Sequence, residues 1–113
     1  INAFSAVASE GRQFIDGPIQ QRPSVIVNCR TLGDFISAER LSHIDILKLD
    51  TQGHEEEILR GGNEYLEGGR VRFVLTELIF ARLYRQQASP GRVISLLEAK
   101  GFKLLDFFDF VYD

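Results

Sequence analysis

The sequence contains no methionine and no tryptophan, and it has a single cysteine. One cysteine cannot form an internal disulfide, and no group of cysteines and histidines has the spacing of a zinc site. A lone thiol is typical of a reducing compartment, so we expect a cytoplasmic protein. Methionine is missing even at position 1, which is Ile1, and we therefore expect this chain to be part of a longer protein.

Long apolar runs and an excess of positive charge are missing as well. No stretch approaches the roughly 20 apolar residues of a membrane-spanning helix, so we expect no membrane partner. The 13 basic and 16 acidic residues give a formal net charge of -3. Nucleic-acid-binding domains usually have a basic excess, so we expect no nucleic-acid partner either. The 113 residues, 44% hydrophobic and 26% charged, have the size and composition of one globular domain.

Short apolar segments alternate with segments of helical periodicity. The apolar segments predict strands at residues 24–28, 44–50, 71–79 and 102–110, with a further short strand possible within 4–14. Helices are predicted to begin near Thr31, His54 and Ser89, where capping hydroxyls or acidic side chains favour a helix start. The pair Gly61-Gly62 weakens the second helix midway. This alternation predicts an α/β fold with a largely parallel sheet.

Acidic residues stand at the ends of two predicted strands. Asp50 and Glu77 occupy these ends, and Glu55 falls in the first turn of the helix after Asp50. Open α/β sheets place their chemistry at the carboxyl ends of strands, and a carboxylate there costs desolvation unless a partner uses it. The structural alternatives are a helix N-cap for Asp50 and an edge-exposed side chain for Glu77. The run of three acids at 55–57 is interpreted as mostly a solvated face, with Glu55 alone turned inward.

The segment around Asp50 resembles the signature of a methyltransferase family. It reads K-L-D-T-Q-G-H-E from Lys48 and I-L-R-G from Ile58, which is similar to the FkbM pattern K-I-D-V-E-G-x-E followed by V-L-K-G. Upstream, T-L-G-D-F from Thr31 resembles the family's T-L-D-D-F box, and Glu77 matches an acid at the end of the next strand. Gln52 departs from the pattern, because the family places a glutamate there.

The resemblance implies a fold and a cofactor. The fold would be a three-layer, Rossmann-like class I methyltransferase sheet, incomplete at its N-terminal side, with residues 1–113 as a single partial domain from the C-terminal part of the catalytic domain. The implied cofactor is S-adenosyl-L-methionine. Its glycine-rich binding loop has no counterpart here, since the sequence contains no G-x-G motif. We therefore assign no cofactor-binding residues and expect the chain alone to be inactive.

Two functions remain open. The first is methyl transfer to a hydroxyl of a small molecule or sugar in the intact protein, in which Asp50, then Glu77, accepts or orients the acceptor's proton and Glu55 supports them. The second is a non-catalytic α/β module that self-associates. The resemblance implies that the strand at 44–50 has lost a neighbouring strand, and an unpaired apolar edge invites a second chain. We therefore expect a homo-oligomer or a part of a longer chain, unless residues 25–27 cover that edge.

Other interpretations are weaker. The string I-D-x-L-K-x-D from Ile44 also occurs in cyclic-dinucleotide phosphodiesterases of the EAL type, but this chain is too short for their barrel. His54 has the chemistry of a general base, although an exposed histidine at a helix start is favoured. Phe107, Phe108 and Phe110 are interpreted as core or subunit-interface residues in preference to a platform for a planar substrate. We assign no metal site.

Overall fold

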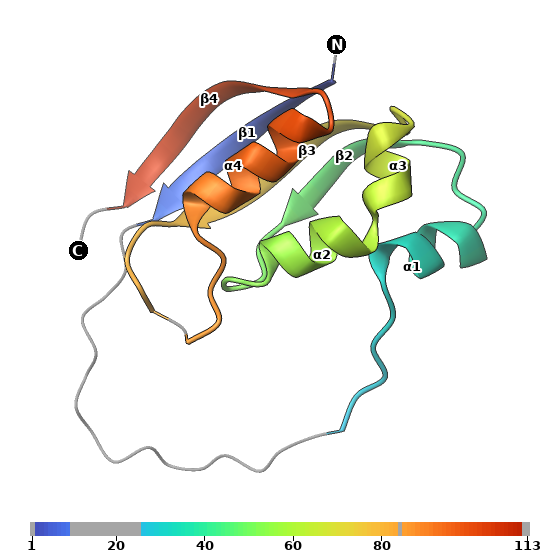
Figure 1. Ribbon diagram of the computed structural model, residues 1–113, viewed down its shortest axis with the longest axis horizontal. Helices are drawn as coiled ribbons and strands as arrows, with labels where there is room; N and C mark the ends of the chain where they lie inside the picture. Colours follow the sequence, from blue (N-terminus) through green and yellow to red (C-terminus); the bar gives the residue numbers. More distant parts are fainter. Residues whose placement is uncertain (1, 10–25, 84, 112–113) are drawn as a thin grey trace.

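The computed structural model describes residues 2–9, 26–83 and 85–111 (Figure 1). These residues form four strands and four helices. In chain order the elements are β1 (Asn2–Ser9), α1 (Leu32–Ala38), β2 (Ile44–Leu49), α2 (Glu55–Gly61), α3 (Asn63–Glu67), β3 (Val71–Ile79), α4 (Pro90–Ala99) and β4 (Phe102–Val111).

The four strands form one sheet in the order β2-β3-β1-β4, and all three pairings are parallel. The predicted parallel α/β sheet is thus confirmed. Strand β1 lies between β3 and β4, so the first strand of the chain is an interior strand. Strand β2 is at the edge and pairs only with β3 among the described strands. In that pairing Leu49, the last residue of β2, lies opposite Thr76, three residues before β3 ends at Ile79.

Helices α2 and α4 cover the same face of the sheet (Figure 1). The core lies between them and the sheet, and its fully buried members include Leu59, Leu66, Val74, Leu78, Val93 and Leu97. The described residues therefore form two layers. The second helical layer of the implied three-layer fold remains a prediction.

Local signals in the sequence explain where the helices begin. Thr31 caps α1, and its Oγ1 accepts a hydrogen bond from the Asp34 backbone N–H at 3.0 Å. Ser89 caps α4 in the same way for Arg92, with Pro90 at the first helical position. The predicted break at the double glycine is also confirmed, because α2 ends at Gly61 and α3 begins at Asn63.

The strand predicted at residues 24–28 is wrong where it can be checked. Residues 26–28 have no regular structure, and Ile26 is fully exposed; residues 24 and 25 lie outside the described residues. Branched side chains favour an extended backbone, but a strand also needs a neighbour to pair with. The short strand sought within 4–14 is found as β1, and residues 10–14 lie outside the described part.

Candidate functional site

Asp50 follows β2 directly and is exposed at the carboxyl end of the sheet. Its Oδ1 atom accepts a hydrogen bond from Gln52 Nε2 at 3.4 Å. Helix α2 begins later, with His54 in the N-cap position, so Asp50 is not the helix cap that the structural alternative requires. An exposed carboxylate at this position can be reached by a ligand.

Glu77 lies beside Asp50 on the neighbouring strand. The register of β2 and β3, with Leu49 opposite Thr76, places the two acids at the same level. Glu77 is half-buried on an interior strand and its Oε2 atom is buried, so it is not an edge-exposed side chain. A small cavity of about 110 Å³ is lined by Lys48, Leu49, Asp50, Leu75, Thr76 and Glu77. The structure thus brings the two predicted acids together at one cavity.

Glu55 does not line this cavity and holds the preceding turn instead. Its side chain is buried, and Oε1 accepts hydrogen bonds from the Thr51 backbone N–H at 3.0 Å and the Thr51 hydroxyl at 2.9 Å. The Gly53 backbone N–H donates to the same oxygen at 3.4 Å. Glu55 is therefore turned inward, as the sequence suggested, and it holds the backbone of the turn that follows Asp50.

The turn between β2 and α2 has an uncommon backbone. Gln52 and Gly53 both have positive φ, 57° and 103°, in a region that favours glycine. A Cβ atom at Gly53 would lie only 3.1 Å from Gln87 Cγ. The Ala88 backbone N–H donates to the Gly53 carbonyl at 2.9 Å, which joins this turn to the loop after β3. The positive φ and the nearby Gln87 side chain therefore both disfavour a larger residue at position 53.

Gln87 organises the loop that follows β3. Its Nε2 donates to the carbonyls of Ile79 at 2.7 Å and Ala81 at 2.9 Å, while its Oε1 accepts from the Leu83 N–H at 3.0 Å. Nothing in the amino-acid sequence points to Gln87 as a structural residue. A glutamine that satisfies several loop groups gives no periodic or motif signal in a single sequence. Together with the turn after Asp50, this loop defines one end of the sheet.

The acidic run at the start of α2 differs from its interpretation as a solvated face. Glu56 is 5% exposed and Glu57 is exposed, so the interpretation is wrong for Glu56 and right for Glu57. Glu56 Oε1 accepts hydrogen bonds from Arg60 at 2.8 and 3.0 Å and from Arg92 at 2.8 Å. These hydrogen bonds from two arginines offset the desolvation cost of burying the charged carboxylate.

Comparison with known proteins establishes the family. The family described as the methyltransferase FkbM domain matches residues 2–104. The chain belongs to the FkbM methyltransferase family. A curated relative, the 2-O-methyltransferase NoeI of Sinorhizobium fredii (strain NBRC 101917 / NGR234), is 35% identical over 82 residues, or 73% of this chain. The chain spans only 30% of the length of that relative. No solved structure matches.

In this FkbM-family chain the family motifs occupy the positions just described. The K-L-D-T-Q-G-H-E segment supplies the end of β2, the turn and the start of α2. The departure at Gln52 leaves a neutral amide bonded to Asp50, where the family has a second carboxylate. The departure at Gly33 fits a close contact, because a Cβ atom there would lie 2.9 Å from the Gly61 carbonyl oxygen.

The cavity at Asp50 and Glu77 is too small to enclose a cofactor. Binding sites for small molecules and cofactors usually enclose about 300–1,000 Å³. The cavity at Asp50 and Glu77 is about 110 Å³. The turn at 51–54 contains one glycine, Gly53, and no glycine-rich loop follows a strand in the described part. We therefore assign no residue of the described part to binding of S-adenosyl-L-methionine.

Other candidates are placed as follows. Among the described residues, no group of three or more metal-ligating side chains could hold a metal ion, and no helix is long and apolar enough to cross a membrane. His54 is exposed at the start of α2, as the favoured interpretation had it. His43 Nδ1 lies 3.0 Å from the Ser42 hydroxyl, and its Nε2 lies 3.6 Å from Asp45 Oδ2. Phe107 packs against the core, whereas Phe108 is 38% exposed.

Proposed function

We propose that this chain supplies the acceptor side of a methyl-transfer site in the natural protein. The observation that carries the proposal is the placement of Asp50 and Glu77 at one cavity, directly after the end of β2 and near the end of the parallel strand β3. This is the edge at which open α/β sheets place their chemistry. Membership of the FkbM family supports methyl transfer as the reaction.

The chemistry proposed for Asp50 is acceptance or orientation of a hydroxyl proton. A hydroxyl oxygen becomes a better nucleophile as its proton moves to a carboxylate. Asp50 is the exposed member of the pair, so it contacts the acceptor, while the half-buried Glu77 flanks it. Glu55 acts indirectly, because its hydrogen bonds fix the turn behind Asp50. Positioning of this kind supplies much of the rate in a transfer that depends on alignment.

The acceptor class is proposed as a hydroxyl of a small molecule or sugar. The relative NoeI is named as a 2-O-methyltransferase, which supports oxygen as the acceptor atom. S-adenosyl-L-methionine, the proposed donor, supplies an electrophilic methyl group when bound. Because the cavity at Asp50 and Glu77 is too small for this cofactor, we propose that it is held by a class I, three-layer methyltransferase domain to which this chain contributes. A reducing, cytoplasmic setting is part of the same proposal.

The test is methyl transfer by the protein as its gene encodes it. Transfer of labelled methyl from S-adenosyl-L-methionine to a panel of sugar and small-molecule hydroxyls is measured for the wild type, Asp50→Asn and Asp45→Asn. Asp45 is the matched control, since it is exposed on the same strand at the opposite end of the sheet. Removal of one acid–base group is expected to lower turnover about 10²–10⁴-fold in Asp50→Asn. Asp45→Asn is expected to keep wild-type turnover.

Two results would count against the proposal. Wild-type turnover in Asp50→Asn would remove the proton-accepting role from that carboxylate. The absence of methyl transfer to every hydroxyl acceptor by the wild type would remove the function itself. Glu77→Gln is expected to reduce turnover by the same factor or less, with unchanged thermal unfolding. A large drop in unfolding temperature would instead assign Glu77 to the fold.

A further inference from the structure

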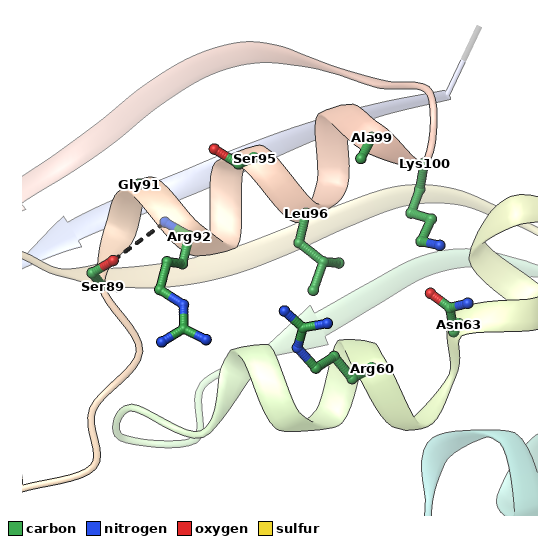
Figure 2. A pocket seen from close by; sticks show the side chains of 9 residues that line it. All are labelled: Arg60, Asn63, Ser89, Gly91, Arg92, Ser95, Leu96, Ala99 and Lys100. Atoms are coloured by element: carbon green, nitrogen blue, oxygen red, sulfur yellow. Dashed lines mark hydrogen bonds between the residues drawn. The ribbon is translucent and has the colours of Figure 1, made fainter.

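A polar groove lies between α4 and the α2–α3 pair, on the helical face of the molecule (Figure 2). It encloses about 600 Å³, which is within the range of ligand sites and far larger than the cavity at Asp50. The polar side chains in its lining are Arg60, Asn63, Ser89, Arg92, Ser95 and Lys100. No carboxylate is among its lining residues.

Two arginines in this groove are held in place by one buried acid. The Glu56 side chain is 7% exposed, and its Oε1 accepts from Arg60 on its own helix and from Arg92 on α4. The arginine side chains themselves remain 63% and 68% exposed. Figure 2 shows both guanidinium groups directed into the space between α2 and α4. A fixed guanidinium loses little further freedom when it binds a ligand, so the pair is preorganised.

The charge in the groove is positive. Arg60, Arg92 and Lys100 contribute three cations, while Glu56 and Glu67, which bond to them, contribute two carboxylates. The positive end of α4, a ten-residue helix, also faces the groove at Ser89. Each guanidinium has five N–H donors, and Glu56 receives two from Arg60 and one from Arg92. Donors and positive charge are therefore left for an anion.

We propose that this groove binds a phosphate or sulfate ester group. Both are tetrahedral oxyanions, and the two guanidinium groups can each offer them paired N–H donors. Ser95, an exposed residue at the rim of the groove, and the Asn63 amide are further polar groups of its lining. The proposal stands on this geometry alone and is independent of methyl transfer. The competing explanation is that the ion pairs of Glu56 with Arg60 and Arg92 only hold α2 against α4 and bind no ligand.

The test is a titration of the full 15N-labelled chain with inorganic phosphate, methyl phosphate and methyl sulfate at constant ionic strength, with chloride as the reference ion. Saturable shifts are expected for backbone amides of Gly91, Arg92 and Ser95 with the oxyanions and not with chloride. Stronger binding of one ester assigns the class of ligand. Shifts that do not saturate, or that spread evenly over all basic surfaces, would overturn the proposal.

Two arginine variants distinguish an anion-binding site from ion pairs that only hold the helices together. Arg92→Gln is expected to weaken phosphate binding about tenfold or more, as loss of charge-assisted hydrogen bonds does. Arg72→Gln, an exposed arginine on β3 bound to Asp45, is expected to bind as the wild type does. Equal weakening in both would show nonspecific charge attraction and overturn the proposal.

Substitution of Ser95 provides a second test, which leaves the ion pairs of Glu56 intact. This test is needed if Arg92→Gln does not fold. No hydrogen bond from the exposed Ser95 side chain is needed for the α2–α4 contact. Ser95→Asp places a negative charge at the rim of the groove and is expected to weaken saturable phosphate binding. Ser95→Asn is a neutral control of similar size and is expected to retain it. Undiminished binding in Ser95→Asp would overturn the proposal.

Discussion

Glu55 and Glu56 are neighbouring buried carboxylates with different partners. Glu55 bonds to the turn before its own helix, whereas Glu56 bonds to arginines on two helices. Sequence alone could place acids in the first turn of a helix, where the helix dipole favours them. It indicated burial of Glu55 but missed that of Glu56, because the burial of Glu56 depends on Arg92 of α4, a segment more than thirty residues away in the sequence. Glu57, in the same run, remains in solvent.

The turn that Glu55 holds gives a prediction about stability. Glu55→Ala leaves the donors of Thr51 and Gly53 without their acceptor, and an unsatisfied buried donor costs about 1–3 kcal/mol. We expect a loss of that order in the free energy of unfolding, measured with a chemical denaturant. Glu57→Ala is the matched control from the same helical turn and should change it by less than about 0.5 kcal/mol. Equal effects would show that the turn does not depend on this carboxylate.

At the scale of elements, the first helix meets the α2–α3 junction through glycines. A Cβ atom at Gly62 would lie 2.6 Å from Leu32 Cδ2, and one at Gly33 would lie 2.9 Å from the Gly61 carbonyl oxygen. The family box T-L-G-D-F thus packs directly on the end of the L-R-G-G segment. These two motifs are far apart in the sequence, and this contact brings them together in the fold.

The contact predicts that Gly62→Ala destabilises the protein. Gly62 has φ of -116°, which alanine adopts without strain, so the effect isolates the steric contact with Leu32. Overpacking of this kind typically costs about 1–3 kcal/mol. Gly91→Ala is the control: nothing lies within 4 Å of its added Cβ, and alanine in a helix should stabilise by about 0.5–1 kcal/mol. Thermal unfolding should shift in opposite directions, and a parallel shift would contradict this account.

An ion pair ties the end of α4 to α3 and depends on pH. Lys100 donates a hydrogen bond to Glu67, and this bond together with the lysine charge lowers the pKa of Glu67 from its ordinary value of 4.5. A lowered carboxylate pKa stabilises the fold above the unfolded-state value, and this stabilisation is lost as pH falls through the folded-state value.

Glu67→Gln should therefore lower the unfolding temperature slightly at neutral pH, because exposed pairs contribute little. The difference from the wild type should shrink as the pH falls below 4.5. Unfolding scans at several pH values, with the exposed Glu98→Gln as control, measure it. A difference that persists unchanged in acid would mean that the pair does not act through the charge of Glu67.

Helices and strands that begin or end at a local sequence signal could be predicted well. The bounds of β3 and the caps of α1 and α4 agree with the sequence signals of apolar alternation, capping hydroxyl and proline. The place of β1 between β3 and β4 could not be predicted, because it is a pairing between segments about seventy or more residues apart. The same limit applies to Gln87, whose partners are all loop backbone groups.

At the scale of the whole molecule, several large apolar side chains of the sheet are exposed. Ile46 on β2 is 65% exposed, its register partner Phe73 on β3 is 39% exposed, and Leu105 on β4 is 60% exposed. Strand β2 also has no described partner on its outer side. An unpaired strand edge beside exposed apolar residues is a surface that invites pairing with a second chain.

The last prediction is that the isolated chain self-associates through this edge and face. Light scattering over a range of concentrations should show dimers or larger species, whether or not the chain has catalytic activity. Ile46→Lys places a charge on the edge strand, which natural sheets use against pairing, and should return the chain towards monomer. Ile26→Lys is the matched control, because Ile26 is fully exposed but lies outside the sheet, and it should not change the association. A monodisperse monomer at high concentration would show that the edge is covered in solution, and the non-catalytic, self-associating alternative would fall with it.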